Sequence, residues 1–283
     1  MYYFLSLFCG VVISVMVASN AGLSNISGMH FSTFFVHLTG MCAILTLALV
    51  KKAKLKHKPL PWYYYIGGAL GVVVVITNTY SFAPLGVSAM LAVGLLGQSV
   101  SSIVIDHFGL FGMAKYEFKP KRIIALAIML VGIMCMIHKF HFFAVVCSII
   151  TGVSLVFQRV FNGKVSECTS VYAGSLLNYL TATPLTIIIF VLFGLNEPII
   201  TNFTLPTNIF PYLGGVIGAS TVLMSNICVS KVPSYSLSVL IFIGQVFTGV
   251  IIDSMLLGQI TVANIIGGTI VSIGLIVDMK LSK

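Results

Sequence analysis

Two amides and two carboxylates recur at the same spacing in a chain that otherwise avoids polar side chains. Gln98 and Asp106 occur in GLLGQSVSSIVID (94–106), and Gln245 and Asp253 occur in IFIGQVFTGVIID (241–253). A carboxamide both donates and accepts hydrogen bonds, which suits a neutral or zwitterionic polar ligand. A carboxylate could carry a proton, act in a gate or pair with Arg122 or Lys139. The alternative roles are hydrogen bonding between helices for the glutamines and structural anchoring for the aspartates.

Other polar side chains inside long apolar runs extend the set of candidates. The expected ligand contacts are Gln98, Gln245, Asn78, Asn226, Ser102, Thr248, Tyr80, Asn20 and Gln158. The candidates for coupling or gating are Asp106, Asp253 and His37, since a histidine titrates near neutrality. Arg159 could extend to an interface or bind an anionic group. For most of these residues helix–helix hydrogen bonding is the alternative, and for His37 it is a satisfied buried histidine.

The composition identifies the environment of these residues. The chain of 283 residues is 58% hydrophobic and 7% charged, with a mean hydropathy of +1.10, whereas soluble domains carry about 25% charged residues. Ten apolar runs are close to the length that crosses a bilayer: 3–21, 31–50, 62–82, 87–106, 121–138, 142–162, 171–194, 208–229, 235–256 and 260–279. They do not alternate as barrel strands do. The sequence therefore predicts an all-α integral membrane protein with ten transmembrane helices.

The basic residues are distributed unevenly between the two sides that ten spans would create. The net charge is +9, and one side collects 14 of the 15 basic residues. They are Lys51, Lys52, Lys54, Lys56, Lys58, Lys115, Lys119, Lys121, Arg122, Arg159, Lys164, Lys231, Lys280 and Lys283. The positive-inside rule makes this side cytoplasmic. We therefore expect a multi-pass protein of the cell membrane with both termini in the cytoplasm, and no nucleic-acid partner.

An internal repeat predicts how the spans are arranged. Residues 65–106 align with 212–253 without a gap, and nine of these positions are identical, including the frame YxGGxxG. The repeat divides the chain into 1–140 and 141–283, with five spans each, so the second unit must enter the membrane from the opposite face. Gln98 and Gln245 then meet near the bilayer centre, as in transporters with inverted repeats, while Asp106 and Asp253 lie at opposite faces. Small residues expected to allow close helix packing are Gly67, Gly71, Gly97, Gly214, Gly218 and Gly244.

These segments resemble the YdcZ-type branch of the drug/metabolite transporter superfamily. The resemblance is carried by WYYYIGGALG, by GQ, by the DxFGxxG pattern of DHFGLFG (106–112), and by LVFQRVFNGKV (155–165), where an Asn follows a Gln by four positions. It implies a fused, ten-span carrier of small solutes that works by alternating access. The second half lacks the FGxxG ending. The distantly similar small multidrug resistance proteins carry a glutamate in their first helix, and this chain has none there, so their cation-for-proton exchange does not transfer.

No pattern in the chain indicates an enzyme. There is no Walker loop, His-Glu-x-x-His or Ser/His/Asp set, and the six cysteines show no Cys-x-x-Cys spacing, so we expect no metal and no cofactor. The leading hypothesis is a secondary transporter of a small polar organic metabolite or drug-like solute, whose partners are the solute and the lipid bilayer, acting as a monomer or homodimer. The alternatives are a lipid flippase or scramblase and a non-transporting membrane scaffold.

Overall fold

The computed structural model describes residues 1–53, 60–113, 115, 119–201, 208–229, 231–232, 234–257 and 262–282. Lys54, Lys56, Lys58 and Lys283, which the charge analysis uses, lie outside these ranges. The described residues form helices and no strands, which confirms the all-α prediction. The elements are α1 (Tyr2–Ser27), α2 (Met29–Val50), η1 (Trp62–Ile66), α3 (Gly67–Phe108), η2 (Leu110–Gly112), α4 (Arg122–Met136), α5 (Phe142–Cys168), α6 (Val171–Phe193), α7 (Pro198–Thr201), η3 (Phe210–Leu213), α8 (Gly214–Val229), α9 (Ser234–Leu257) and α10 (Val262–Ser282).

The longest helix, α3, is broken near its middle. It has 42 residues, so a straight helix would be about 63 Å long, roughly twice the thickness of a hydrocarbon core. Pro84 lies inside it, and Gly86 leaves the helical region with φ 74° and ψ 173°. A proline lacks the N–H of the helical ladder, and glycine tolerates positive φ at little cost. The two parts of α3, 67–85 and 87–108, therefore correspond to two of the predicted apolar runs.

Seven of the described helical segments are long and apolar enough to cross a membrane. The segment Trp62–Phe108, which contains α3, counts as one of the seven. Two shorter apolar helices cover Arg122–Met136 and Val262–Asp278. The coarse prediction of a multi-span helical membrane protein is therefore confirmed. The count of ten spans additionally requires that α3 crosses twice and that both shorter helices cross.

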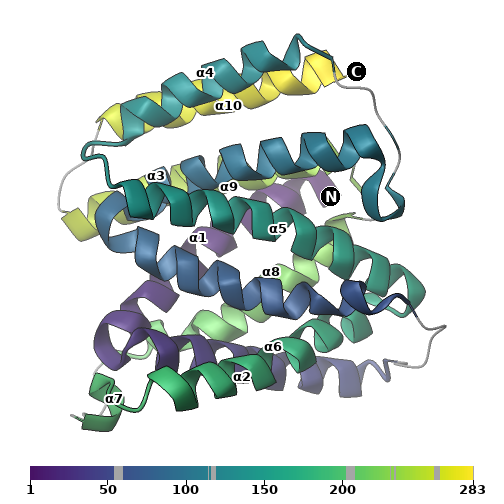
Figure 1. Cartoon of the computed structure of the whole chain (residues 1–283), viewed down its shortest axis with the longest axis vertical. Coiled ribbons are helices and arrows are strands. Elements are labelled where there is room, and N and C mark those ends of the chain that lie inside the picture. The colour runs from purple at the N-terminus through teal and green to yellow at the C-terminus, as the bar shows by residue number, and fades with distance from the viewer. Residues whose placement is uncertain are drawn as a thin grey trace.

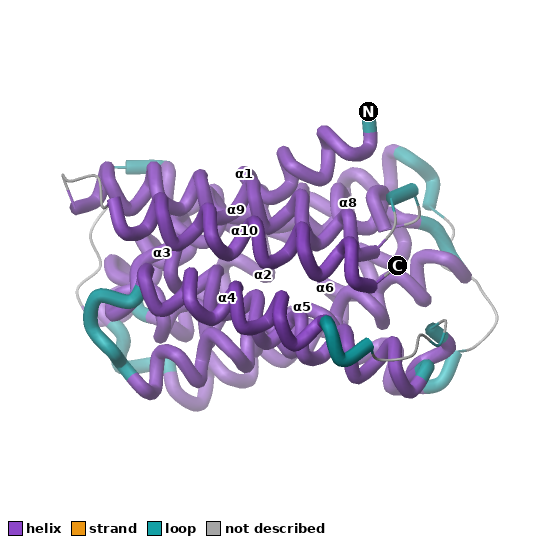
Figure 2. The backbone as a smooth tube through the Cα atoms, turned by 90° about the horizontal axis from the view of Figure 1, so that it is seen from above, coloured by secondary structure: helices purple, strands orange, loops and turns teal. Residues whose placement is uncertain are grey.

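The helices form an elongated bundle with a helix pair at each edge. The pair α4 and α10 forms one edge, the pair α2 and α6 forms the opposite edge, and α3, α5, α1 and α9 lie between them (Figure 1). Helix α5 packs mainly on α3, and α1 packs mainly on α9. Both described termini lie at the same end of the bundle in the two views (Figures 1 and 2). An ion pair joins α4 to α10 at this end, because Arg122 donates to both carboxylate oxygens of Asp278 over 2.7 and 2.8 Å.

Close helix contacts recur in pairs across the two halves of the chain. A Cβ placed on Gly67 would collide with Oδ1 of Asn162, and a Cβ placed on Gly214 would collide with Oδ1 of Asn20. Asn162 follows Asn20 by 142 positions, and Gly214 follows Gly67 by 147. The contact is thus the same one with the halves exchanged: the third helix of each half meets the first helix of the other.

A second pair of contacts follows the same offsets. A Cβ on Gly10 would collide with Ile241 in α9, and a Cβ on Gly152 would collide with Gly94 in α3. The predicted packing glycines all lie within 4 Å of another helix at their Cβ position. Their neighbours are Asn162 for Gly67, Gln158 for Gly71, Ile149 for Gly97, Asn20 for Gly214, Met16 for Gly218 and Leu7 for Gly244. Because glycine has no side chain, the backbones of the two halves can approach each other closely at these positions.

Candidate functional site

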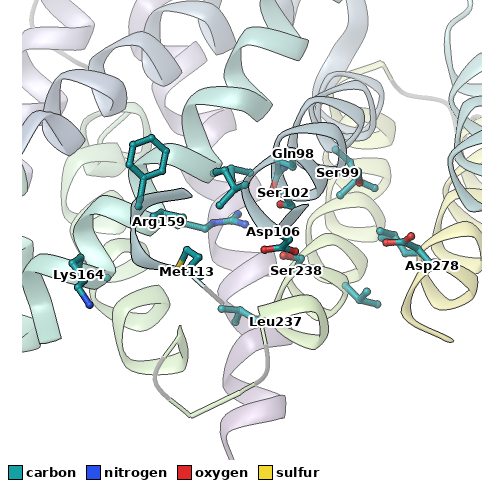
Figure 3. A pocket seen from close by; sticks show the side chains of 18 of the residues that line it. Gln98, Ser99, Ser102, Asp106, Met113, Arg159, Lys164, Leu237, Ser238 and Asp278 are labelled. Carbon is teal, nitrogen blue, oxygen red and sulfur yellow. The ribbon is translucent and has the colours of Figure 1, made fainter. Parts of the chain in front are cut away.

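A cavity of about 340 Å³ lies among the second part of α3, α5, α9 and the end of α10. We call it the wide cavity. Gln98, Ser102 and Asp106 come from one face of α3, since they are four residues apart and an α-helix has 3.6 residues per turn, and Ser238 comes from α9 (Figure 3). The cavity extends to Glu167 near the end of α5, a residue that is exposed. The lining therefore runs from Gln98, near the middle of the second part of α3, to the exposed Glu167, at the end of the bundle where the termini lie.

Three cations and three carboxylates belong to the walls of the wide cavity. Arg122 pairs with Asp278, and Nζ of Lys164 lies 3.3 Å from Oε2 of Glu167. Arg159 projects from α5, and its guanidinium points toward the wall that carries Ser102 and Asp106 (Figure 3). Among the described residues no carboxylate lies within ion-pair distance of Arg159. The cavity thus presents a guanidinium that is not neutralised by a described neighbour.

A second cavity, of about 130 Å³, lies between the two halves. We call it the central cavity. Its lining combines residues of one half with their counterparts in the other, at the offsets of 142 and 147 seen in the helix contacts. These counterparts are Met16 and Gln158, Asn20 and Asn162, His37 and Tyr179, Gly71 and Gly218, and Asn78 and Ser225. The central cavity is therefore lined by equivalent positions of the two halves.

Some polar side chains of the central cavity are hydrogen-bonded to one another, and others have no partner among the described residues. In the second half, Oδ1 of Asn178 accepts from Nδ2 of Asn162 over 3.0 Å and from Nε2 of Gln158 over 3.4 Å. Oδ1 of Asn20 in the first half is buried without a hydrogen-bond partner among the described residues, and so is Nε2 of Gln245 in the second half. Native proteins leave few buried polar atoms unpaired. These two atoms are therefore candidates to bond a ligand or water.

His37 presents one ring nitrogen to the central cavity. Its Nδ1 lies 2.8 Å from the carbonyl oxygen of Thr33. A carbonyl only accepts, so Nδ1 carries the proton and donates, which leaves Nε2 as an acceptor. Nε2 is the atom that faces Gly71 across the cavity. A buried histidine with one satisfied nitrogen matches the structural alternative, while the free acceptor keeps His37 among the possible ligand contacts.

The two glutamines face the interior but do not share one chamber. Gln98 and Gln245 are 7% and 2% exposed, so neither side chain turns toward lipid. Gln98 lines the wide cavity, whereas Gln245 lines the central cavity. The two amides therefore border different cavities in this conformation. Only one member of each equivalent pair borders the wide cavity.

Most of the other expected residues line one of the two cavities. Asn78, Asn226, Asn20, Gln158 and His37 line the central cavity. Ser102 and Asp106 line the wide cavity.

Tyr80 and Thr248, which were also expected to contact a ligand, line neither of these two cavities. Tyr80 follows Asn78 by two residues, which turns it about 200° around the helix, and it is 47% exposed beside the ring of Phe143. Thr248 lies toward the end of α9 where Ile252 packs on an apolar cluster.

Asp253 holds the break in α3 rather than lining a cavity. Its carboxylate accepts from the backbone N–H groups of Val87 and Ser88 over 2.8 and 2.9 Å and from Oγ of Ser88 over 2.6 Å. Val87 and Ser88 begin the second part of α3, whose first amides lack helical partners. Asp253 therefore caps this helix start across the interface. This geometry matches the structural alternative and gives no support to coupling through Asp253.

Three polar residues of the cavities are not in the set of expected ligand contacts, and one of them, Arg159, was expected either to extend to an interface or to bind an anionic group. They are Arg159, Asn162 and Asn178. Asn162 was recognisable as the counterpart of Asn20, and as the residue one helical turn after Gln158. Arg159 was expected near the helix end, yet nine residues separate it from Cys168, about 14 Å along the helix axis. No spacing in the sequence showed which face of α5 Arg159 occupies.

Comparisons with known proteins agree with the helical bundle. The profile of a family described as "Putative inner membrane exporter, YdcZ" matches residues 1–135 and 143–277. A search of curated proteins found no match. A solved structure titled "Crystal structure of protein" is 13% identical, and the alignment covers 99% of this chain and 96% of that one with a TM-score of 0.65. At this identity the likeness concerns the fold alone.

Proposed function

This chain belongs to the YdcZ family, which is described as "Putative inner membrane exporter, YdcZ", and from that premise we propose that it is a secondary transporter of a small polar organic solute. The solute is a metabolite or a drug-like molecule that crosses by alternating access. Its site lies where the two halves meet, in the wide and central cavities. Membership of a membrane exporter family supports transport in general, and the site assignment rests on the cavities.

The proposed topology is ten transmembrane helices in two inverted halves, 1–140 and 141–283. The break at Gly86 supports counting α3 as two spans. The paired contacts of Gly67 with Asn162 and of Gly214 with Asn20 support an axis that exchanges the halves. In an inverted pair such an axis lies in the membrane plane and places the site near the midplane. The transport unit is then one chain.

One observation carries the alternating-access proposal: the two ends of the bundle differ although their helices are equivalent. At one end the wide cavity is bordered by Arg159, Leu237 and Ser238. Their counterparts at the offsets of 142 and 147 are Val17, Met90 and Leu91, which form a buried apolar cluster with Val87. One end is thus open and the equivalent end is packed shut. Exchanging these two packings would move the opening to the other side of the membrane.

The basic residues assign the open end to the cytoplasm in this proposal. Lys164 and Arg122 both border the wide cavity, and the positive-inside rule places such basic residues at helix ends in the cytoplasm. The conformation is then inward-open, with both termini on the same side. For an exporter this is the state that loads its solute.

The test is counterflow in liposomes. The purified protein is reconstituted with a panel of unlabelled metabolites inside, and uptake of each labelled solute is measured for the wild type, Gln98→Ala and Gln245→Ala. We expect one solute class to exchange, and both variants to lower the rate. Thr248→Val is the matched control, because Thr248 lies on α9 with Gln245 and lines neither cavity. Its exchange rate should equal that of the wild type.

Two results would overturn the proposal. Movement of labelled lipid between leaflets without exchange of any solute would identify a flippase or scramblase. Absence of both activities in folded, correctly inserted protein would identify a scaffold that does not transport.

A further inference from the structure

Arg159 occupies a position where a cation is energetically costly. It lies nine residues from the end of α5 at Cys168, about 14 Å along the axis, which is too far for its side chain to reach the helix end. A charged side chain near the centre of a membrane helix is destabilising unless it faces a partner or a water-filled cavity. Arg159 lines both the wide and the central cavity. Among the described residues that border these cavities, no other belongs to both.

Four of the five described carboxylates have a partner other than Arg159. Asp278 accepts from Arg122, Glu167 lies beside Lys164, and Glu197 pairs with His30. Asp253 caps the second part of α3 through Val87 and Ser88. Asp106 borders the same cavity as Arg159 but lies beyond ion-pair distance from it. Within the described part of the chain, Arg159 is therefore a cavity-lining guanidinium without a carboxylate partner.

The first half of the chain serves as an internal control for the role of Arg159. At the offset of 142 its counterpart in α1 is Val17, which packs in an apolar cluster with Val87, Met90 and Leu91. The neighbouring positions keep their pairing, since Asn162 and Asn20 contact equivalent glycines. Helix packing at this place is thus compatible with a valine. A structural requirement of the fold does not explain the arginine, because the equivalent helix lacks it.

The groups around Arg159 suit an oxyanion. A guanidinium binds a carboxylate or phosphate through two parallel N–H donors. Gln98 and Ser102 on the facing wall of the wide cavity add neutral donors (Figure 3), and Gln158, which lines the central cavity, has a second N–H besides the one that it donates to Asn178. Neutral donors strengthen the binding of an anion without introducing a competing charge.

We propose that the transported solute carries a carboxylate or phosphate group and that Arg159 binds this group at the junction of the two cavities. The proposal rests on the proposed function and adds the charge of the substrate to it. The polar remainder of the solute then lies toward Gln98 in the wide cavity. As the open end closes, Arg159 stays beside the solute, because it borders the central cavity as well.

The test is ligand-dependent thermal stabilisation of the full chain in nanodiscs of phosphatidylcholine. The probes are two pairs that differ in charge, benzoate with benzamide and succinate with succinamide, together with inorganic phosphate. We expect at least one anion to raise the unfolding midpoint, while its amide does not. In Arg159→Val, which introduces the residue found in the first half, the concentration for half-maximal stabilisation should rise by about tenfold or more.

Two further variants separate binding from folding and from general electrostatics. Lys121→Gln removes an exposed charge one residue before Arg122, at the same end of the bundle, from a side chain that lines neither cavity. It should leave the half-maximal concentration unchanged. If Arg159→Val does not fold, Arg159→Lys decides the question, because it keeps the charge but loses the bidentate fork. Weaker binding by Arg159→Lys supports the proposal, and unchanged binding overturns it.

Several outcomes overturn the proposal. They are a wild type that no anionic probe stabilises, amides that bind as well as their acids, and equal loss in Lys121→Gln and Arg159→Val. Stabilisation that depends on Arg159 but appears only when phosphatidylglycerol replaces phosphatidylcholine would show a lipid headgroup instead of a free solute. Counterflow separates this failure from failure of the proposed function: unaltered solute exchange by Arg159→Val leaves the transporter standing and removes the anion site.

Discussion

The contact between Asp253 and the break in α3 gives a sharp stability prediction. Replacing Asp253 by Ala leaves the backbone N–H groups of Val87 and Ser88 without an acceptor in a buried environment. Each buried donor that loses its partner costs about 1–3 kcal/mol. The hydroxyl of Ser88 can rotate, and Nδ2 of Asn264 stays bonded to it. We therefore expect Asp253→Ala to lower the free energy of unfolding by about 2–4 kcal/mol.

The conservative variant has a smaller expected effect. Asn keeps one acceptor oxygen but turns an NH2 group toward the second N–H, so Asp253→Asn should cost about 1–2 kcal/mol. Gly86→Ala perturbs the same junction from the other side, because Gly86 has φ 74° and an added Cβ would lie 3.0 Å from Oδ1 of Asp253. A positive φ combined with an extended ψ is a region that glycine almost alone occupies, and it costs another residue about 1–3 kcal/mol.

The assay is thermal unfolding of detergent-purified protein, followed by the fraction that stays monodisperse after heating. For a chain of this size, 1 kcal/mol shifts the midpoint by about 2–4 °C, so Asp253→Ala should lower it by roughly 4–16 °C. Ser254→Ala is the neighbouring control, because its hydroxyl bonds only within α9, to the carbonyl of Ile251. If Asp253→Ala is no less stable than Ser254→Ala, the carboxylate does not stabilise the break and the reasoning fails.

Two further predictions concern contacts between helices. Gly10→Ala and Gly152→Ala should destabilise the protein by similar amounts of about 1–3 kcal/mol, because each added Cβ collides with the backbone of an equivalent helix in the other half. Gly22→Ala is the control. Its added Cβ meets only Pro211, at 3.6 Å, so this variant should be neutral in the same thermal assay. A double-mutant cycle of thermal stabilities at Arg122 and Asp278 should give a coupling free energy of about 1–3 kcal/mol. The reason is that both side chains are largely buried and are joined by two hydrogen bonds. Additive effects of the two single variants would show that the pair does not hold α4 to α10.

The sequence determined the class of this protein and the pairing of its halves. Apolar length and low charge are local properties of the chain, and they suffice to predict membrane helices because lipid offers no partner to a backbone amide. The repeat of Tyr65–Asp106 as Tyr212–Asp253 fixed equivalent positions. The structure places the predicted packing glycines in equivalent contacts between the halves. The polar residues found at mid-run, such as Gln98, Asn78 and Gln158, line cavities because the interior is where a costly polar group finds partners.

The tertiary structure alone decided how the two halves differ. Hydropathy gives the length of a helix but not its rotation, so the sequence could not show that Arg159 faces both cavities while Tyr80 and Thr248 face neither. It also could not show that Asp253 caps Val87, because that bond joins residues 166 positions apart. The repeat predicts equal halves, whereas the wide cavity opens at one end and Val17, Val87, Met90 and Leu91 fill the equivalent end. Symmetry of the sequence constrains which helices can meet, and the packing of side chains determines which of two equivalent interfaces is open.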